Sequence, residues 1–126
     1  YSSDRRLKTN ITNIDNALDK VLKLNGVRFN WADDIHERGF HGAAPGEKAV
    51  GVIAQEVEAV LPELVAPAPF DALTDEETGE YLGSKSGEDY KTVKYEKLTA
   101  LLIEAVKELS AKVDSQQEEI DRLKGL

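Results

Sequence analysis

The sequence contains no cysteine and no methionine, and only one tryptophan, two histidines and four prolines occur among its 126 residues. Without cysteine, disulfide bonds and thiolate metal sites are excluded, and a reducing compartment is compatible with the composition. No run of about 18 apolar residues and no charged leader before an apolar stretch is present, so we expect neither a membrane span nor a signal peptide. The absence of an initiating methionine indicates a fragment, a processed product or an expressed piece of a longer protein.

Basic residues are in the minority, 16 against 24 acidic ones, which gives a net charge of −8. An acidic surface repels nucleic-acid backbones and anionic lipids, so we expect no nucleic-acid and no membrane partner. The length suits one domain with a modest hydrophobic core.

Hydrophobic periodicity predicts short elements in the first half of the chain. Apolar residues at three- and four-residue intervals favour a helix over residues 11–24, with Asn13 as its N-cap. Residues 27–31 alternate between apolar and polar, which is typical of a half-buried strand, and Trp31 is expected to be a core or interface anchor.

The middle of the chain is predicted to alternate between short elements and loops. In chain order we expect a loop over 32–48, a strand over 49–53 with Val50 and Val52 alternating against Gly51, a helix over 54–61 ended by Pro62, a short strand at 64–65, a surface loop or hairpin over 67–89, and a strand over 90–95.

The last quarter of the chain is predicted to be one long helix. From Leu98 onward the spacing alternates between four and three residues, interrupted only by Gln116, which indicates a coiled-coil seam. The seam consists of Leu102, Val106, Leu109, Val113, Ile120 and Leu123. The fold class is therefore α+β, a small mixed domain over 1–97 with short strands and helices, followed by a C-terminal oligomerisation helix over 98–126.

A hydroxyl and an amine lie close together near the N-terminus, at Ser3 and Lys8. A serine hydroxyl is a weak nucleophile near neutral pH unless a base removes its proton, and a lysine serves as that base when burial lowers its pKa. Spacing alone makes such a pair weak support for catalysis, because serine and lysine occur within six residues of each other in most proteins.

Four ordered motifs raise the specificity of this pattern. They are SDRRLKTNI at 3–11, LNGVRFNW at 24–31, GVIAQEVEAVLPELV at 51–65 and TVKYEKLTALLIEAVKEL at 92–109. Together they resemble the C-terminal intramolecular chaperone domain of phage tailspikes and tail fibres, a family that cuts itself off its own fibre. A similar domain occurs in membrane-tethered transcription factors of the myelin regulatory factor type.

The resemblance implies a function and a site. Ser3 is then the nucleophile of a self-cleaving serine peptidase, Lys8 its base, and the peptide bond between Ser2 and Ser3 the cleavage site. No cofactor and no metal are implied. The partners are two further copies in a homotrimer and the upstream fibre segment of the same polypeptide. The location is the host cell cytoplasm during virion assembly, and the mature virion is expected to lack the domain.

Several alternatives remain open at this point. Five residues along a helix or a strand place the two side chains on different faces, so either a turn lies between Ser3 and Lys8 or Ser3 of one protomer meets Lys8 of its neighbour. Asp4 is either an orienting partner of Lys8 or a helix-start or surface acid, and we favour the latter. Ser2, with cleavage after Tyr1, is a second candidate nucleophile. By the simple packing rule the seam favours a parallel dimer, whereas the resemblance implies a trimer.

Other polar groups give weaker signals. His36 and His41 lie five residues apart and could ligate a metal, but no third ligand has a recognisable spacing. Gln55 and Glu56 resemble a family motif, although helix surface is the commoner explanation. The competing function is a permanent trimerisation or adaptor module without proteolytic activity.

Overall fold

A computed structural model describes residues 2–125. The alternative cleavage after Tyr1 therefore lies outside the described residues, as do the first residue of the predicted domain 1–97 and the last residue of the predicted helix 98–126. The chain divides into two compact units. One combines the N-terminal residues up to Val21 with the chain from Thr99 onward, and the other runs from Leu22 to Leu98. The predicted α+β class, with short strands and helices followed by a long C-terminal helix, is confirmed.

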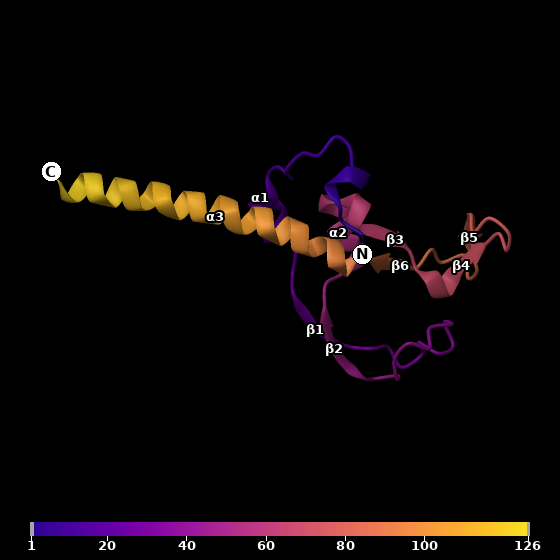
Figure 1. Cartoon of the computed structure of the whole chain (residues 1–126). Coiled ribbons are helices and arrows are strands. Elements are labelled where there is room, and N and C mark those ends of the chain that lie inside the picture. The colour runs from indigo at the N-terminus through magenta and orange to yellow at the C-terminus, as the bar shows by residue number, and fades with distance from the viewer. Residues whose placement is uncertain (1, 126) are drawn as a thin grey trace. The chain divides into compact units, whose positions relative to one another are not determined.

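The unit from Leu22 to Leu98 contains three antiparallel strand pairs, one short α-helix and two 3₁₀ turns, Pro62–Leu64 and Pro69–Asp71, and it ends in the first turn of the long helix (Figure 1). The pairs are β1 (Val27–Asn30) with β2 (Lys48–Gly51), β3 (Val65–Pro67) with β6 (Lys91–Val93), and β4 (Ala72–Thr74) with β5 (Tyr81–Ser84). The helix is α2 (Ala54–Val60). Each sheet has only two strands, so its stability depends on packing against the rest of the unit.

The core of this unit gathers around α2 and the turn that follows it. Leu61 ends the helix because Pro62 disfavours helical backbone at the preceding residue and lacks an amide hydrogen. The buried apolar side chains are Ile35, Val57, Leu61, Leu64 and Ala68. Full burial of a side chain such as Val57 contributes about 1.5–3 kcal/mol.

In the β1–β2 pair, β1 half-buries the apolar face that the sequence predicted, whereas β2 does not bury Val50. Register pairs Phe29 with Ala49 and Val27 with Gly51, and these positions are half-buried. Val50 points the other way and is 74% exposed. A Cβ at Gly51 would lie 2.5 Å from Tyr95 Oη, which accepts the amide hydrogen of Val52, so any larger residue there would displace the Tyr95 hydroxyl from this contact.

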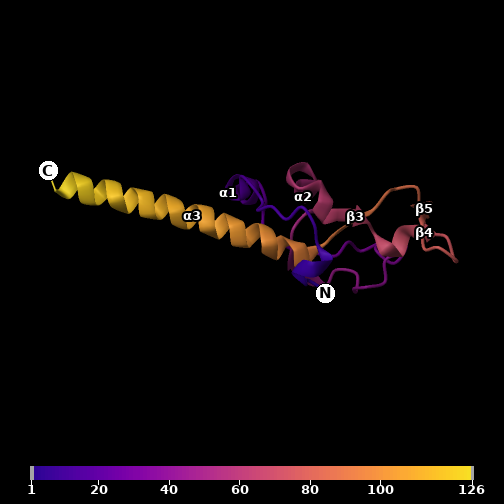
Figure 2. The same ribbon diagram turned by 45° about the horizontal axis from the view of Figure 1, so that its top comes forward.

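The other unit contains most of α1 (Ala17–Leu22) and most of α3 (Tyr95–Lys124), which both views place side by side (Figure 1, Figure 2), and a 3₁₀ turn at Arg5–Leu7. The prediction of a helix over 11–24 was too long. Asn16 has φ 50°, a left-handed conformation that cannot continue an α-helix, so the helix begins at Ala17. Asn13 is not its N-cap and instead donates a hydrogen bond to Glu104 on α3.

One side of α3 is covered and another is bare. Leu101 and Ala105 are buried, whereas the predicted seam residues are between 45% and 63% exposed in the single chain. Their identities are Leu102, Val106, Leu109, Val113, Ile120 and Leu123. An apolar stripe of this length on one helix is typical of an interface between helices. The coiled coil and its trimeric state remain predictions.

Candidate functional site

A single 3₁₀ turn, Arg5–Leu7, separates the two predicted catalytic residues. Asp4 caps this turn by accepting the amide hydrogen of Arg6 at 2.8 Å. The amide of Leu7 donates to the carbonyl of Asp4, and the amide of Lys8 donates to that of Arg5. The backbone is extended at Asp4 and again at Lys8, so the helical segment between the two residues is a single turn.

The turn brings Ser3 and Lys8 together within one chain. Lys8 Nζ lies 2.6 Å from Ser3 Oγ, a hydrogen bond with the amine as donor. Of the two arrangements that the five-residue spacing allows, the described geometry is the one with a turn between the residues. A nucleophile and a base within hydrogen-bonding distance are the arrangement that general-base activation of a hydroxyl requires.

Ser3 and Lys8 are both exposed in the single chain. A lysine that acts as a base must spend time as the neutral amine, and removal of water is the usual way to favour that form. The described geometry therefore supplies contact between the two groups but no burial.

The Asp4 carboxylate hydrogen-bonds to Arg6 and not to Lys8 within the described part of the chain. Its carboxylate accepts from Arg6 Nε and Nη2 at 3.1 and 2.9 Å, in addition to the backbone amide of Arg6. The side-chain hydrogen bond from Arg6 lowers the pKa of Asp4. Asp4 thus acts as a helix-start acid, the interpretation that the sequence favoured.

The segment that follows Ser3 and Lys8, the proposed catalytic dyad, is attached to α3 by two carboxylates. Glu108 accepts the amide hydrogens of Ala17 and Leu18 at 2.7 and 3.4 Å, and Glu104 accepts the side-chain amide of Asn13 at 3.0 Å. A carboxylate at the start of a helix satisfies free amide groups and interacts favourably with the helix dipole. These contacts span about 90 positions of sequence, so no local pattern could have predicted them.

A family model described as chaperone of endosialidase, Peptidase_S74, matches residues 3–66. The match begins at Ser3 and covers about half of the chain. The chain belongs to this family. The resemblance on which the site prediction depends is therefore confirmed, while the catalytic role of Ser3 and Lys8 stays a prediction.

Relatives with similar sequences are long tail fibre proteins Gp37 of phages. Those of Enterobacteria phages K3 and T2 are each 42% identical over 111 residues, or 88% of this chain, and that of Salmonella phage S16 is 29% identical over 99% of it. The chain spans only 7% of the length of the first two and 14% of the third.

A solved structure shows a similar fold. The crystal structure of a novel intramolecular chaperone aligns with a TM-score of 0.53 and 24% identity, covering 87% of this chain and 99% of the other. This match supports the fold, with its short strands and long final helix.

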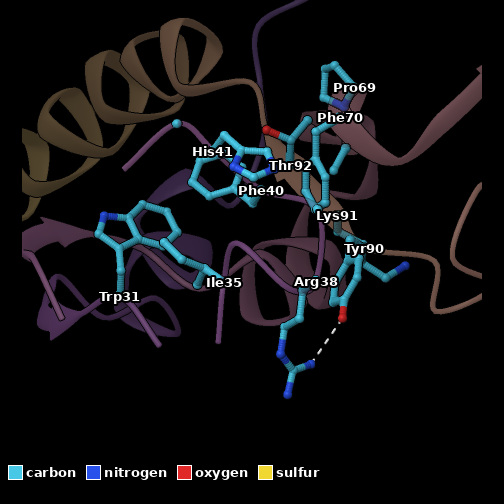
Figure 3. Close-up of a pocket in the computed structure, with 13 residues that line it drawn as sticks. Trp31, Ile35, Arg38, Phe40, His41, Pro69, Phe70, Tyr90, Lys91 and Thr92 are labelled. Carbon is cyan, nitrogen blue, oxygen red and sulfur yellow. Dashed lines mark hydrogen bonds between the residues drawn. The ribbon is translucent and has the colours of Figure 1, made fainter. Parts of the chain in front are cut away.

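Sequence reasoning missed a pocket in the unit from Leu22 to Leu98. It has a volume of about 830 Å³ and is lined mainly by aromatic and small apolar residues (Figure 3). Trp31, Phe40, Phe70 and Tyr90 form a chain of rings whose successive centroids lie 5.0, 5.3 and 5.6 Å apart. Arg38 donates to Tyr90 Oη across this pocket and also pairs with Asp34. The only signal in the sequence was the aromatic residues themselves, which are scattered over 60 positions.

The weaker candidates of the sequence have ordinary surroundings. His36 and His41 stack with ring centroids 4.9 Å apart, and among residues 2–125 no group of three potential ligands could hold a metal ion. Gln55 is exposed, and Glu56 accepts a hydrogen bond from Asn25. No helix within the described part of the chain is long and apolar enough to cross a membrane.

Proposed function

We propose that this chain is the C-terminal intramolecular chaperone of a phage tail fibre or tailspike, and that it releases itself by cleaving the Ser2–Ser3 bond. The observation that carries the proposal is the contact of Ser3 Oγ with Lys8 Nζ at 2.6 Å, at the position where the family match begins. The names of the relatives supply the kind of upstream segment, a long tail fibre.

The reaction is a single-turnover acyl transfer. Ser3 Oγ attacks the carbonyl carbon of Ser2 while Lys8, as the neutral amine, takes the hydroxyl proton. The bond between that carbon and the Ser3 nitrogen breaks, and Lys8 returns the proton to the leaving amine. Water then hydrolyses the ester between Ser2 and Ser3 Oγ. The products are a carboxylate at Ser2 and a free N-terminal Ser3.

Assistance of folding follows from assembly of three chains. Intertwined β-fibres form many contacts between distant residues and different chains, so they fold slowly and expose strand edges that aggregate. A trimer built on the α3 seam holds three chain ends together and raises their effective concentration. Once the fibre has closed, a kinetic barrier maintains it and the chaperone can leave.

The cellular setting follows from the same proposal. The partners are two further copies of the chain and the fibre segment that precedes Ser3. Folding assistance and cleavage take place in the host cell cytoplasm during virion assembly, and the released domain is absent from the mature virion. No cofactor, metal, nucleic acid or membrane takes part in the reaction as written.

The experiment is expression of the chain behind its native upstream segment, with intact mass and a denaturing gel as readouts. The wild type is expected to yield a fragment that begins at Ser3. Ser3→Ala is expected to stay uncut because it lacks the nucleophile. Lys8→Arg, which keeps the positive charge but stays protonated, is expected to lose at least about 100-fold in rate. A wild-type chain that oligomerises but stays uncut contradicts the peptidase part of the proposal.

A second function is favoured by the exposure of both members of the dyad in the single chain. It is a permanent trimerisation or adaptor module in which Ser3 and Lys8 are surface residues. The same gel separates the two functions, because the permanent module remains attached to its fibre in every variant.

A further inference from the structure

The turn between Ser3 and Lys8 is not held in place by packing in the single chain. None of the residues Arg5–Leu7 is buried, and Leu7 is 74% exposed. Two backbone hydrogen bonds close the turn, from the amides of Leu7 and Lys8. An isolated turn with so few bonds is marginal in water, because fixing its backbone angles costs more conformational entropy than the bonds return.

Asp4 and Arg6 supply three more bonds to this turn. One carboxylate oxygen of Asp4 accepts both the backbone amide and Nε of Arg6, and the other accepts Nη2. The planar guanidinium therefore meets the carboxylate in a two-point contact, which fixes orientation as well as distance. These two residues lie between the nucleophile and the base in the sequence, so their contact sets the path of the chain from Ser3 to Lys8.

We propose that Asp4 and Arg6 form a clamp that positions Ser3 against Lys8 for cleavage. The inference rests on the proposed function. Neither residue of the clamp touches the scissile bond, so both are positioning residues. The clamp acts by keeping the turn closed, which maintains the hydrogen bond between Ser3 Oγ and Lys8 Nζ. Small displacements of reacting groups reduce rates steeply, so a loosened turn slows cleavage.

A positioning role differs from a direct electrostatic effect of Asp4 on Lys8. If Asp4 acted on the charge of Lys8, its removal would shift the pH at which the cleavage rate reaches half its maximum. A clamp instead changes the maximal cleavage rate and leaves that half-maximal pH unchanged. Asp4 stays ionised and Arg6 stays protonated throughout the neutral and alkaline range in which an amine titrates, so the clamp is intact over the whole profile.

The test measures the cleavage rate against pH in the full chain with its upstream segment, pulse-labelled in cell-free synthesis and quenched at intervals. Asp4→Asn keeps a capping side chain but loses the ion pair, so a three- to fivefold lower maximum is expected, about the effect of an exposed pair. Asp4→Ala also removes the cap, and about a tenfold loss is expected. Arg6→Gln should resemble Asp4→Asn, and combining these two changes should cost no more than either alone.

The matched control is Arg5→Gln, which removes the same charge from the same turn. Among the described residues Arg5 makes no side-chain hydrogen bond or ion pair, so its maximum rate should equal that of the wild type. Thermal unfolding and size-exclusion chromatography confirm that each variant folds and assembles equally.

If Asp4→Ala and Arg6→Gln reach the same maximal cleavage rate as the wild type, the clamp is overturned while the peptidase function stands. A changed half-maximal pH with an unchanged maximum also overturns it, in favour of an electrostatic role for Asp4. An uncut wild type overturns both the clamp and the proposed cleavage.

Discussion

Among single residues, Asp71 is the buried charged side chain of the unit from Leu22 to Leu98. Its side chain is 4% exposed, and its carboxylate accepts from Ser84 Oγ at 2.5 Å and from the amide of Ser86 at 2.9 Å. Its backbone carbonyl also accepts the amide hydrogen of Lys85. The side-chain hydrogen bond from Ser84 lowers the pKa of Asp71, so this one carboxylate, in its ionised form, ties the residue that precedes β4 to the end of β5.

This lowered pKa predicts acid sensitivity of the β4–β5 hairpin. A carboxylate with a folded pKa below its unfolded value stabilises the fold at all pH values above the unfolded pKa, and the effect disappears as pH falls through the folded pKa. The loss should therefore begin below about pH 4. The protection of the Ser86 amide against hydrogen exchange, taken relative to its intrinsic exchange rate at each pH, is expected to fall below that pH in the wild type.

Asp71→Asn is expected to lower the protection of the Ser86 amide about tenfold already at pH 7, because a charged acceptor has been replaced by a neutral one. Little further loss of protection is expected in acid. Asp33→Asn, an exposed carboxylate on the loop between β1 and β2, serves as the control. Equal exchange at Ser86 in Asp71→Asn and the wild type would show that the carboxylate does not hold the hairpin.

Among the elements, α3 has two faces with different roles. Leu101, Ala105 and Glu108 recur at four- and three-residue spacing and form one stripe, which includes the two buried side chains and the carboxylate that meets α1. The exposed seam lies on a different face. The helix that is proposed to assemble three chains thus also anchors the segment that leads from Lys8 to α1.

Removal of the charge of Glu108 tests this anchor. Glu108→Gln leaves one side-chain oxygen for the amides of Ala17 and Leu18 and removes a negative charge from the start of α1, so a loss of about 1 kcal/mol in unfolding free energy is expected. Urea unfolding followed by circular dichroism measures it. Glu118→Gln, at an exposed position near the far end of α3, is expected to change the stability by less than about 0.5 kcal/mol.

At the scale of the whole molecule, the proposed trimer is built on the seam of α3. Val113 is 53% exposed in the single chain and lies in the middle of the seam. Val113→Asp places a charge at the centre of the proposed interface, where its burial without a partner would be costly. The trimer is expected to dissociate at micromolar concentration, as measured by sedimentation velocity.

Ala111→Asp is the matched control, because it introduces the same charge two residues away on the exposed side opposite the seam. It is expected to remain trimeric. Dissociation by both variants, or by neither, would contradict an interface on the seam.

Mixed trimers test whether the dyad forms within one chain. Lys8 contacts Ser3 of its own chain, so a Ser3→Ala chain lacks the nucleophile and a Lys8→Ala chain lacks the base. Co-expression of these two variants is expected to give mixed trimers with no cleavage. Cleavage of the Lys8→Ala chain would show that a neighbour supplies the base, the alternative that the five-residue spacing left open. Mass spectrometry identifies which chain is cut.

Local patterns determined much of this fold. Alternation over 27–31 predicted β1, proline at position 62 predicted the end of α2, and four-three spacing predicted α3, although that helix begins at Tyr95 rather than near Leu98. Ser3 and Lys8 were also selected from the sequence, through their place in a family motif. Each of these features depends on residues within one or two turns of one another, which is the range over which periodicity carries information.

Only the tertiary structure decided the rest, because the deciding partners lie far away in the chain. The first amides of α1 are capped by Glu108, the buried face of β2 depends on Phe29 and Tyr95, and the aromatic pocket joins three separate segments. The Ser3–Lys8 contact lies between these cases. The sequence named both residues, but two arrangements were compatible with their spacing, and the turn that Asp4 caps determines which of them the single chain adopts.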